Sequence, residues 1–479
     1  MAAPLTIRGQ KTIPTPWQER ILKRDFEVVL GKMLQPEQQS EDETEEPYLR
    51  SANVQWAGVD LSDIKTMWFS SREKKELLLK AGDLVVNEGG DVGRCATWTG
   101  GIKACYFQNA VNRVRPRQKA SARFLYYWLY NIKHAGFIDA IVGRTTIAHL
   151  TAEKLEAIPW ADAPPSEQHR IAAYLDASCA AIDAAVAAKR RQLETLDAIR
   201  KSAAHQVLSE GLRPGLPLKD SGIESIGVIP AHWDVKQIRY ACEVNYGITL
   251  QLEKGQSVGD GVRILTVSNL TIDGNLDLED EYYIDPALLT KADYLRRGDL
   301  LFNWRNGSQY HVGKTAFFDM EGEVAHVSFL LRIRCGRHMN PFFMRSYLGV
   351  LKDAGFFAGA KDKVNKTFNS TELKRLRVVI PPLDEQKEVC REIERRNKEC
   401  NDVKAAIETQ IATLTAYRKS LIHECVTGQR RVTEADVARS GVSKDIRQLN
   451  SEPSEAIGRL ETNHSDDLQC FTNRISRRP

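Results

Sequence analysis

The sequence predicts two tandem mixed α/β (α+β) globules, each followed by a long helix, and three observations support this fold class. The length of 479 residues is about three times that of a typical domain. The chain repeats itself at an offset of a little over two hundred residues. In both copies a proline pair, at 164–165 and 381–382, precedes a long charged stretch of helical pattern. We therefore expect the order globule, helix, globule, helix.

The repeat is visible in short motifs that keep their order along the chain. Shifting the sequence by 216 residues, from 13 to 229, aligns IPTPW at 13–17 with IPAHW at 229–233. The same shift aligns AGDLVVN at 81–87 with RGDLLFN at 297–303. Small insertions then accumulate, but the matches continue to the ends of both helical stretches. This collinear order indicates an internal duplication of nearly the whole chain.

Each globule is predicted to mix short strands with short helices. Residues 1–163 and 213–380 are punctuated by Gly, Asn and Asp, and they carry β-type runs such as DLVV, DLLF and LLRIRC. Helices are expected at 121–137 and 340–356, and shorter helices near Leu155 and Leu373. The two globules should therefore share one architecture.

The two long helices are expected at 164–212 and 381–429, because proline favours the first turn of a helix. Apolar residues recur in both at alternating spacings of three and four, which is typical of a coiled coil. These residues are Leu175, Cys179, Ile182, Val186, Leu193 and Leu196 in the first helix, and Ile393, Cys400, Ile407, Ile411, Leu414 and Leu421 in the second.

The order of the parts predicts an antiparallel coiled coil with a pseudo-twofold axis, because the second helix must run back toward the first globule. Lys189 and Ile407 occupy equivalent positions, so one helix supplies an apolar residue where the other carries a cation. Such a strut of forty residues would span at most about 60 Å. The alternative is two independent helices that each pack on their own globule.

Composition indicates a soluble protein of mixed surface charge. The charge of 67 − 63 = +4 is mildly basic, so any nucleic-acid site must come from local clusters of Lys and Arg. A signal peptide is not evident and a cytoplasmic location is expected. The nine cysteines contain no Cys-x-x-Cys pair, and Cys179, Cys400 and Cys425 are expected to be small buried apolar residues.

Two segments are expected to lie outside the repeated architecture. The acidic run EDETEE at 41–46 is interpreted as a solvent-exposed loop, because it would repel nucleic acid. Residues 430–479 are poor in apolar residues and have no counterpart in the first half. We expect a polar, partly disordered tail there, with a helix near 433–448.

Two similar but diverged globules on one chain suit double-stranded DNA with two different half-sites. Arg, Asn and Thr in loops are the residue types that contact guanine, adenine and the thymine methyl, whereas Lys mostly neutralises phosphate. The candidates in the first globule are Arg94, Arg117, Arg144, Thr145 and Thr146. Those in the second are Arg305, Asn306, Ser308, Lys314, Lys361, Lys363, Asn365 and Lys366.

Two further patterns bear on this surface. Gly93-Arg94 and Gly313-Lys314 place a cation directly after a glycine, which would let the backbone approach a phosphate. The arginines of RVR at 113–115 and RIR at 332–334 are instead interpreted as ordinary exposed residues of a regular strand. Gly82 and Gly298 are expected to be turn residues.

A catalytic apparatus is not evident in the sequence. NPFF at 340–343 lacks the second proline of the motif with which adenine methyltransferases hold a flipped base, and it is better explained as a helix start. EKK at 73–75 resembles part of a nuclease motif but is a single triplet in a charged helix. No Gly-rich cofactor loop or Walker loop is present.

The sequence resembles the DNA specificity subunits of type I restriction-modification systems. The resemblance rests on the two-unit repeat, on the IP-x-x-W openings, and above all on IPPLDEQKEV and the helical stretch after it at 380–429. A weaker twin lies at 158–211, where PPSEQ lacks the usual residue between the proline pair and the acid. The likeness covers residues 13–430.

The resemblance implies that each globule is a target recognition domain for one half of a bipartite DNA sequence, and that the helices form the spacer. It implies no catalysis by this chain. Two modification subunits would bind S-adenosylmethionine, and restriction subunits would use ATP and Mg²⁺. The duplicated junction is a candidate docking surface for the partners, through Glu167, Gln168, Glu385 and Gln386. The alternatives are a stand-alone DNA-modifying enzyme and a two-headed protein-binding scaffold.

Overall fold

The computed structural model describes residues 14–142, 149–249, 261–271, 274–306, 311–357 and 366–439. Contacts between residues divide the chain into two compact units. Among the described residues, the first unit holds 14–190 and 408–439, and the second holds 191–407. We call residues 14–163 the first domain and 213–380 the second domain. Each unit therefore contains one domain and one half of each long helix.

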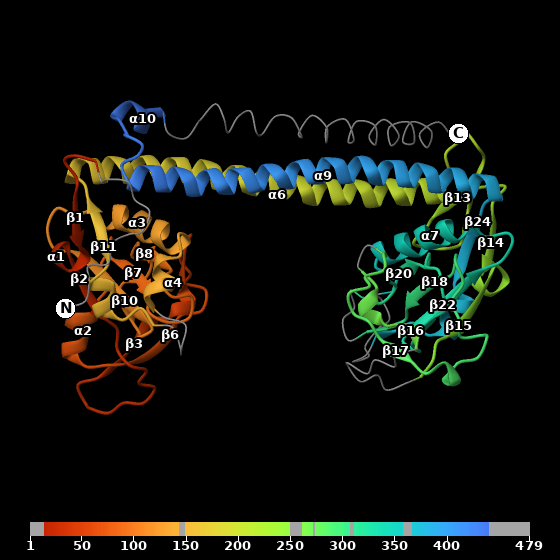
Figure 1. Ribbon diagram of the computed structural model, residues 1–479, viewed down its shortest axis with the longest axis horizontal. Helices are drawn as coiled ribbons and strands as arrows, with labels where there is room; N and C mark the ends of the chain where they lie inside the picture. Colours follow the sequence, from red (N-terminus) through yellow and green to blue (C-terminus); the bar gives the residue numbers. More distant parts are fainter. Residues whose placement is uncertain are drawn as a thin grey trace, which may run out of the picture. The chain divides into compact units, whose positions relative to one another are not determined.

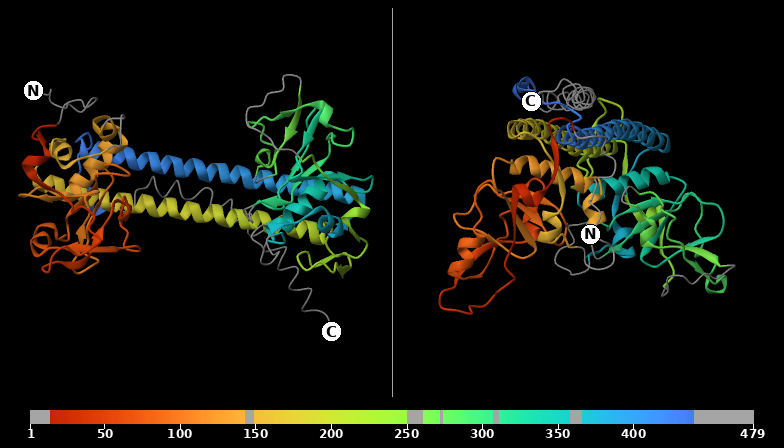
Figure 2. Two further views of the ribbon diagram at one scale, coloured as in Figure 1. Left: turned by 90° about the horizontal axis from the view of Figure 1, so that it is seen from below. Right: turned by 60° about the vertical axis from the view of Figure 1, so that its left-hand side comes forward.

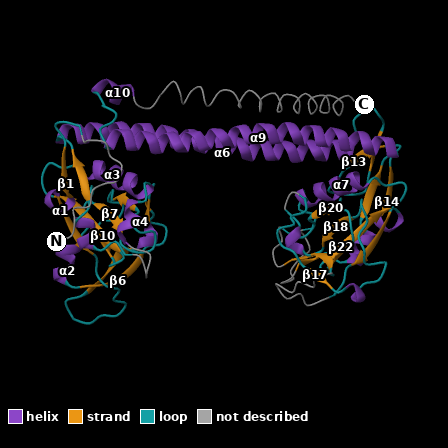
Figure 3. Cartoon of the chain, viewed as in Figure 1, coloured by secondary structure: helices purple, strands orange, loops and turns teal. Residues whose placement is uncertain are grey.

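Within its described residues, the first domain combines eleven strands with short helices (Figures 1 and 3). Its strands are β1 Gln18–Ile21, β2 Phe26–Leu30, β3 Thr44–Leu49, β4 Val54–Gln55, β5 Gly58–Val59, β6 Lys65–Phe69, β7 Leu84–Asn87, β8 Cys95–Thr97, β9 Tyr106–Phe107, β10 Val111–Pro116 and β11 Pro159–Asp162. Its helices are α1 Leu22–Asp25, η1 Ser51–Asn53, α2 Ser71–Leu77, α3 Ala122–His134, α4 Phe137–Val142 and α5 Ala152–Glu156.

The second domain repeats this plan (Figure 1). Its strands are β12 Leu218–Asp220, β13 Val228–Pro230, β14 Asp234–Gln237, β15 Cys242–Tyr246, β16 Val262–Leu265, β17 Tyr283–Ile284, β18 Leu300–Asn303, β19 Arg305–Asn306, β20 Thr315–Phe317, β21 Val324–His326, β22 Leu330–Cys335, β23 Lys366–Thr367 and β24 Arg377–Ile380. Its helices are η2 Ile238–Tyr240, η3 Val267–Asn269, η4 Pro286–Leu288, α7 Pro341–Asp353 and α8 Ser370–Arg375.

The sheets of the two domains correspond strand by strand. A four-stranded antiparallel sheet has the order β2-β10-β7-β8 in the first domain and β15-β22-β18-β20 in the second. A three-stranded sheet has the order β6-β3-β9 in one and β17-β16-β21 in the other, and each contains one parallel pair. The sequence duplication is thus a duplication of topology.

The four-stranded sheet is buried on both faces, which explains the apolar runs LVV and LLF. Leu84 and Val86 belong to a core shared with α3, whereas Val85 points into a second core with the three-stranded sheet. In the second domain Leu300 and Leu301 divide in the same way. Alternate side chains of a strand point to opposite faces, so a doubly covered strand must be apolar throughout.

The long helices are α6 Pro165–Glu210 and α9 Leu383–Val426, followed by α10 Glu434–Arg439. In the first unit the N-terminal half of α6 and the C-terminal half of α9 lie side by side in every view (Figures 1 and 2). Arg170 Nε donates to the carbonyl of Val432 at 2.7 Å, and Arg418 pairs with Asp183 at 3.1 Å. Because residue numbers rise along one segment as they fall along the other, the two segments of this unit run in opposite directions.

The second unit contains the corresponding pair of helix segments. Val207 and Leu208 of α6 share a core with Val389, Cys390 and Ile393 of α9. These five side chains are all at least nine-tenths buried. In each unit the helix segments therefore pack on one another and on the domain of that unit. We predicted that each long helix is a spacer separate from the globules. In the structure, half of each helix instead belongs to the core of a globule.

Two further expectations need correction or limits. The acidic run at 41–46 is not wholly a loop, because Thr44 begins β3 and Glu43 is buried, accepting hydrogen bonds from Gln35 Nε2 at 2.9 Å and from the backbone N–H of Gln39 at 2.7 Å. The helix expected near 433–448 is observed over Glu434–Arg439, and residues after 439 lie outside the described part.

Among the described residues, α6 is the one helix that is long and apolar enough by composition to cross a membrane. Core helices of soluble proteins pass the same test. Ile171, Leu175, Cys179 and Ile182 of α6 are buried in the core of the first unit. Length and composition alone therefore do not make α6 a membrane span.

Candidate nucleic-acid interface

The duplicated tryptophan and the duplicated glutamate meet at the junction between domain and helix. Trp17 Nε1 donates to Glu167 Oε2 at 3.0 Å, and Trp233 Nε1 donates to Glu385 Oε2 at 2.9 Å. Each acid lies in the first turn of its helix, where a negative charge is favoured by the helix dipole. The motif that opens each repeat is thus hydrogen-bonded to the first turn of the long helix that follows the same domain.

The second junction carries one additional partner. His232 Nε2 lies 3.0 Å from Glu385 Oε1. Although burial raises the pKa of Glu385, the hydrogen bonds from Trp233 and His232 outweigh it and hold that pKa below its usual range. This carboxylate is therefore ionised and engaged within the fold.

The neighbouring glutamines join each helix to the domain core. Gln168 accepts from the backbone N–H of Ser121 at 2.8 Å and donates to the carbonyl of Ala163 at 2.7 Å. Gln386 accepts from the backbone N–H of Asn340 at 2.7 Å and donates to the carbonyl of Pro381 at 2.8 Å. Ser121 and Asn340 are the N-caps of α3 and α7.

This geometry corrects the predicted docking role of the glutamines. The side chains of Gln168 and Gln386 are both 0% exposed, so a partner protein has no access to them. Their amides satisfy backbone groups at a helix start and at a helix N-cap. Glu167 and Glu385 are partly exposed but are engaged by tryptophan.

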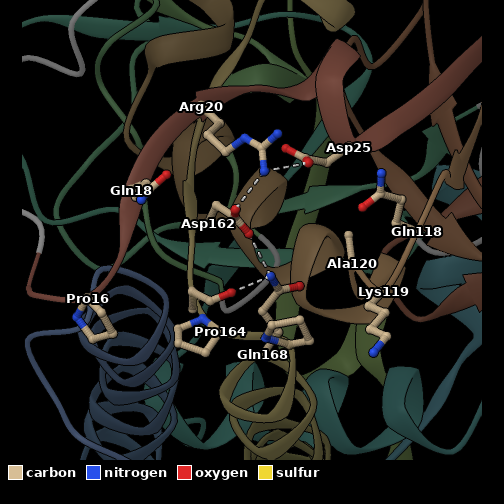
Figure 4. A pocket seen from close by; sticks show the side chains of 12 residues that line it. Pro16, Gln18, Arg20, Asp25, Gln118, Lys119, Ala120, Asp162, Pro164 and Gln168 are labelled. Atoms are coloured by element: carbon tan, nitrogen blue, oxygen red, sulfur yellow. Dashed lines mark hydrogen bonds and ion pairs between the residues drawn. The ribbon is translucent and has the colours of Figure 1, made fainter.

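A pocket of about 260 Å³ lies at the first junction (Figure 4). Figure 4 shows Arg20 between two carboxylates, and its Nη1 lies 3.0 Å from Asp25 and 3.1 Å from Asp162. Gln168 Nε2 donates to Asp162 at 3.0 Å from below. Burial raises the pKa of Asp25 despite the indole of Trp160 and the guanidinium of Arg20. Arg20, Asp25 and Asp162, three of the four charged residues that line this pocket, bind one another, so the pocket resembles a structural joint more than a catalytic centre.

The residues predicted to contact bases in the first domain differ in their exposure, and three of them lie outside the described residues. Arg117 is exposed, and its Nε donates to the carbonyl of Phe26 at 3.1 Å. Arg94 is half-buried and lies 3.4 Å from Asp91. The predicted loop residues Arg144, Thr145 and Thr146 lie outside the described residues.

In the second domain the structure separates Arg305 from Lys314. Arg305 is exposed, and its guanidinium lies 5.8 Å from the ring centroid of Phe329. Lys314 is only 7% exposed and donates to the carbonyl of Leu270 at 3.2 Å, and burial lowers its pKa. Lys314 is therefore buried within the domain and does not present its ammonium to a phosphate.

The other candidates of the second domain are only partly visible or not visible. Asn306 and Lys366 are paired across β19 and β23, and this describes their backbone alone. Ser308, Lys361, Lys363 and Asn365 lie outside the described residues.

The glycines before Arg94 and Lys314 have a packing reason. Gly93 has φ +80°, and an added Cβ would lie 2.7 Å from the side chain of Ile138. Gly313 has φ +88°, and its Cβ would lie 2.4 Å from the ring of Phe357. Both glycines let a turn approach an apolar side chain of its own domain, which explains them without a phosphate.

The arginines expected to be ordinary exposed strand residues are instead part of the structure of each sheet. Arg113 is 3% exposed and pairs with Glu27 at 3.1 Å, and its counterpart Arg332 is 2% exposed and pairs with Glu243 at 3.1 Å. Strand alternation does not expose these side chains, because a second sheet covers the face to which they point.

The second arginine of each strand forms a bidentate pair with a buried aspartate. Arg115 binds Asp83 with two contacts of 2.6 Å, and Arg334 binds Asp299 with two contacts of 2.7 Å. The aspartates follow Gly82 and Gly298, whose φ values of +94° and +93° agree with the predicted turns. These four arginines form ion pairs within their own domains.

Residue-by-residue reasoning missed the aromatic side chains around Arg305. Tyr246 and Phe329 are each 46% exposed, and Trp304 packs edge-to-face on Tyr246 with ring centroids 5.5 Å apart. The adjacent Trp and Arg in NWRNG were a usable signal, but Tyr246 and Phe329 lie far away in sequence. Within the described part of the chain, no group of three His, Cys, Asp or Glu side chains could hold a metal ion.

Comparison with known families and proteins gives consistent matches. Residues 14–195 match the type I restriction modification DNA specificity domain. A relative from Methanocaldococcus jannaschii, named for the type I restriction enzyme MjaX, is 28% identical over 209 residues, which are 42% of this chain and 47% of the relative. The chain thus spans about half the length of that relative.

Two other matches cover more of the chain. The specificity subunit of the type I restriction enzyme EcoBI from Escherichia coli is 24% identical over 370 residues, which are 72% of this chain and 73% of that protein. A chain from a structural study of complex assembly and conformational transition of the type I R-M system has a TM-score of 0.69 at 14% identity, covering 88% of this chain and all of that one. This last likeness shows that the fold is shared.

Proposed function

We propose that the chain belongs to the family of type I restriction modification specificity proteins and that each of its two domains binds one half of a bipartite double-stranded DNA sequence. One observation carries this proposal. The family model matches residues 14–195, and the second half of the chain repeats the matched part in topology and in its internal contacts. Two copies of a DNA specificity domain in one chain suit two half-sites.

The repeat extends to buried polar contacts that a chance resemblance would not reproduce. Asn53 donates to the carbonyls of Asp60 and Asp63, and Asn269 donates to those of Asp277 and Asp280. The Trp-Glu pairs and the arginine pairs of the sheets are likewise present twice. The second domain thus has the same scaffold as the one that the family model matches.

We further propose that α6 and α9 form one antiparallel coiled coil that sets the distance between the half-sites, with a pseudo-twofold axis relating the halves of the chain. The opposite directions of the two helix segments in the first unit support this proposal. So does the burial of the predicted seam residues Leu175, Ile182, Ile407 and Leu414, each of which is 0% exposed.

The chain acts by recognition and is not an enzyme, in keeping with relatives that are named as specificity subunits. Its partners would be double-stranded DNA, two modification subunits that bind S-adenosylmethionine, and restriction subunits that use ATP and Mg²⁺, all in the cytoplasm. The partners would dock near the two helix starts, on exposed surface that excludes the buried Gln168 and Gln386.

Co-expression with a cognate modification subunit tests this function. The expected result is adenine methylation of one bipartite motif across the host genome, read by single-molecule sequencing. Exchanging residues 13–163 for the corresponding domain of another family member should then change one half of the motif and leave the other half intact. A genome without a methylated bipartite motif would contradict the proposal.

Binding to DNA should also weaken steeply with salt. Each phosphate neutralised by Lys or Arg contributes about −0.9 to the slope of log K against log salt concentration. The purified complex, titrated with its duplex at several salt concentrations, should give a slope of several units. If the chain were instead a protein-binding scaffold, any binding to DNA would lack this dependence on salt.

A further inference from the structure

One end of the four-stranded sheet of the second domain presents aromatic rings and an arginine to solvent. Tyr246 ends β15, and Phe329 directly precedes β22. Arg305 follows the end of β18 by two residues, and its guanidinium lies over the ring of Phe329. Because these strands are antiparallel neighbours, the three residues gather at the same end of the sheet.

Hydrogen bonds hold the backbone beside Phe329 and the hydroxyl of Tyr246. Trp304 Nε1 donates to the carbonyl of Ser328 at 2.7 Å, directly beside Phe329. The hydroxyl of Tyr246 accepts from the backbone N–H of Ser370 at 3.1 Å. Exposed aromatic surface is unfavourable in water, and its retention on a rigid support is typical of a binding surface.

The same place in the first domain has the same backbone but different chemistry. The backbone N–H of Leu150 donates to the carbonyl of Glu88 at 2.9 Å, and that of Phe368 donates to the carbonyl of Trp304 at 2.8 Å. Glu88 thus occupies the position of Trp304. It pairs with His149 at 3.8 Å, and its side chain is 13% exposed. The fold therefore does not require an aromatic residue or a cation at this place.

We infer that Arg305, Phe329 and Tyr246 form a base-contacting surface of the second domain, on which Arg305 recognises a guanine in duplex DNA. This inference rests on the proposed function. A guanidinium donates two parallel hydrogen bonds to O6 and N7 of guanine, and that of Arg305 lies over the ring of Phe329. Tyr246 and Phe329 supply apolar contact to the edges of neighbouring base pairs, such as the methyl group of thymine.

The shift that aligns Glu88 with Trp304 places Gly89 at the position of Arg305, which implies that the two half-sites differ where this surface meets DNA. Glycine has no side chain, so the first domain has no guanidinium at this position to contact guanine. We therefore assign the guanine to the half-site of the second domain.

The test uses the full chain assembled with its modification subunit. The wild-type motif is first determined from genomic methylation, and duplexes with each base pair replaced in turn are then titrated. Arg305→Ala should relax one guanine position in one half-site, reducing discrimination there about tenfold to a hundredfold. Arg305→Lys should not restore it, because an ammonium lacks the fork of donors. Phe329→Ala should relax the same position.

Arg239 provides a matched control in the same domain. It is exposed and stacks on Tyr240 at 5.5 Å, but it precedes β15 and so lies at the opposite end of that strand from Tyr246. Arg239→Ala should leave the motif unchanged.

The outcomes separate the inference from the function beneath it. A wild-type complex without a bipartite motif overturns the proposed function itself. A clear wild-type motif that Arg305→Ala leaves unchanged overturns the inference alone. Equal weakening on all sequences, restored by Arg305→Lys, would show a phosphate contact and also overturns the inference.

Discussion

The first and second domains share their internal polar contacts but differ at the sheet end that carries Arg305. Asp83 and Asp299 bind arginine with the same bidentate geometry, within 0.1 Å in each contact. At the corresponding sheet end, the first domain has Glu88 beside His149, whereas the second domain has Trp304 followed by Arg305. The difference teaches that the duplicated scaffold is held constant by buried ion pairs, while surface chemistry has diverged on it.

The cores also differ at one buried position of the three-stranded sheet. Phe107 in β9 and His326 in β21 both pair with a leucine of the central strand, Leu49 and Leu265 respectively. His326 is 1% exposed, and neither of its ring nitrogens has a hydrogen-bond partner among the described residues. Burial, with Arg332 nearby, lowers the pKa of His326 to about 4. An imidazole thus takes the place of a phenyl ring.

The largest expected effect tests whether the shared ion pairs stabilise each domain independently. Asp299→Ala should cost the second domain about 3 kcal/mol, because it leaves Arg334 partly buried without its partner. Asp83→Ala should cost the first domain a similar amount. Hydrogen exchange followed by peptides of each domain would measure both effects.

The surface pair Lys133–Asp139 serves as the control for this comparison. Its aspartate side chain is 61% exposed, so Asp139→Ala should change exchange rates little. Equal loss of protection in both domains after a single substitution would contradict their independence.

A smaller effect should distinguish the cores by their response to pH. The unfolded chain protonates a histidine near pH 6.5, whereas folded His326 resists protonation until about pH 4. Between these two pKa values the unfolded state binds more protons than the folded state. The contribution of His326 to stability is therefore complete above about pH 6.5 and is lost as the pH falls toward about 4. Because of His326, the free energy of unfolding of the second domain should thus fall by about 2 kcal/mol between about pH 7 and pH 5.

Substitutions exchanged between the domains would verify this contribution. His326→Phe should remove that part of the pH dependence from the second domain, and Phe107→His should introduce one into the first. Urea unfolding of the variants across this pH range would measure it. An unchanged pH profile of His326→Phe would show that the buried imidazole is not responsible.

The smallest effect concerns the two tryptophans at the junctions. Trp17→Phe removes the indole donor of Glu167 and should cost about 1.5 kcal/mol, as expected for a hydrogen bond to a charged group. Trp233→Phe should cost about 1 kcal/mol, because His232 still donates to Glu385. Thermal unfolding of the two variants would rank them. Equal costs would mean that His232 contributes nothing to the junction.

Local sequence patterns predicted much of the fold for identifiable reasons. The helix expected at 121–137 is observed over Ala122–His134, and the one at 340–356 over Pro341–Asp353. NPFF is a helix start, since Asn340 accepts from the backbone N–H of Phe342 at 2.8 Å. Caps and apolar periodicity act over a few residues, so they can be recognised without tertiary information.

Predictions about exposure were less successful. Arg113 and Lys314 are both buried although their residue types favour the surface. Their burial depends on Glu27 and on the carbonyl of Leu270, which approach from distant parts of the sequence. The patterns around Arg113 and Lys314 do not reveal these partners.

The sequence by itself determined the duplication, the two long helices, their apolar seam and the resemblance to a DNA specificity family, because repeats, periodicity and motifs are properties of the chain's order. Only the tertiary structure decided that Gln168 and Gln386 are internal joints and that Tyr246, Arg305 and Phe329 gather at one sheet end. The reason is physical. Burial and juxtaposition depend on which distant strands pair and which faces are covered, and these are settled when the chain folds.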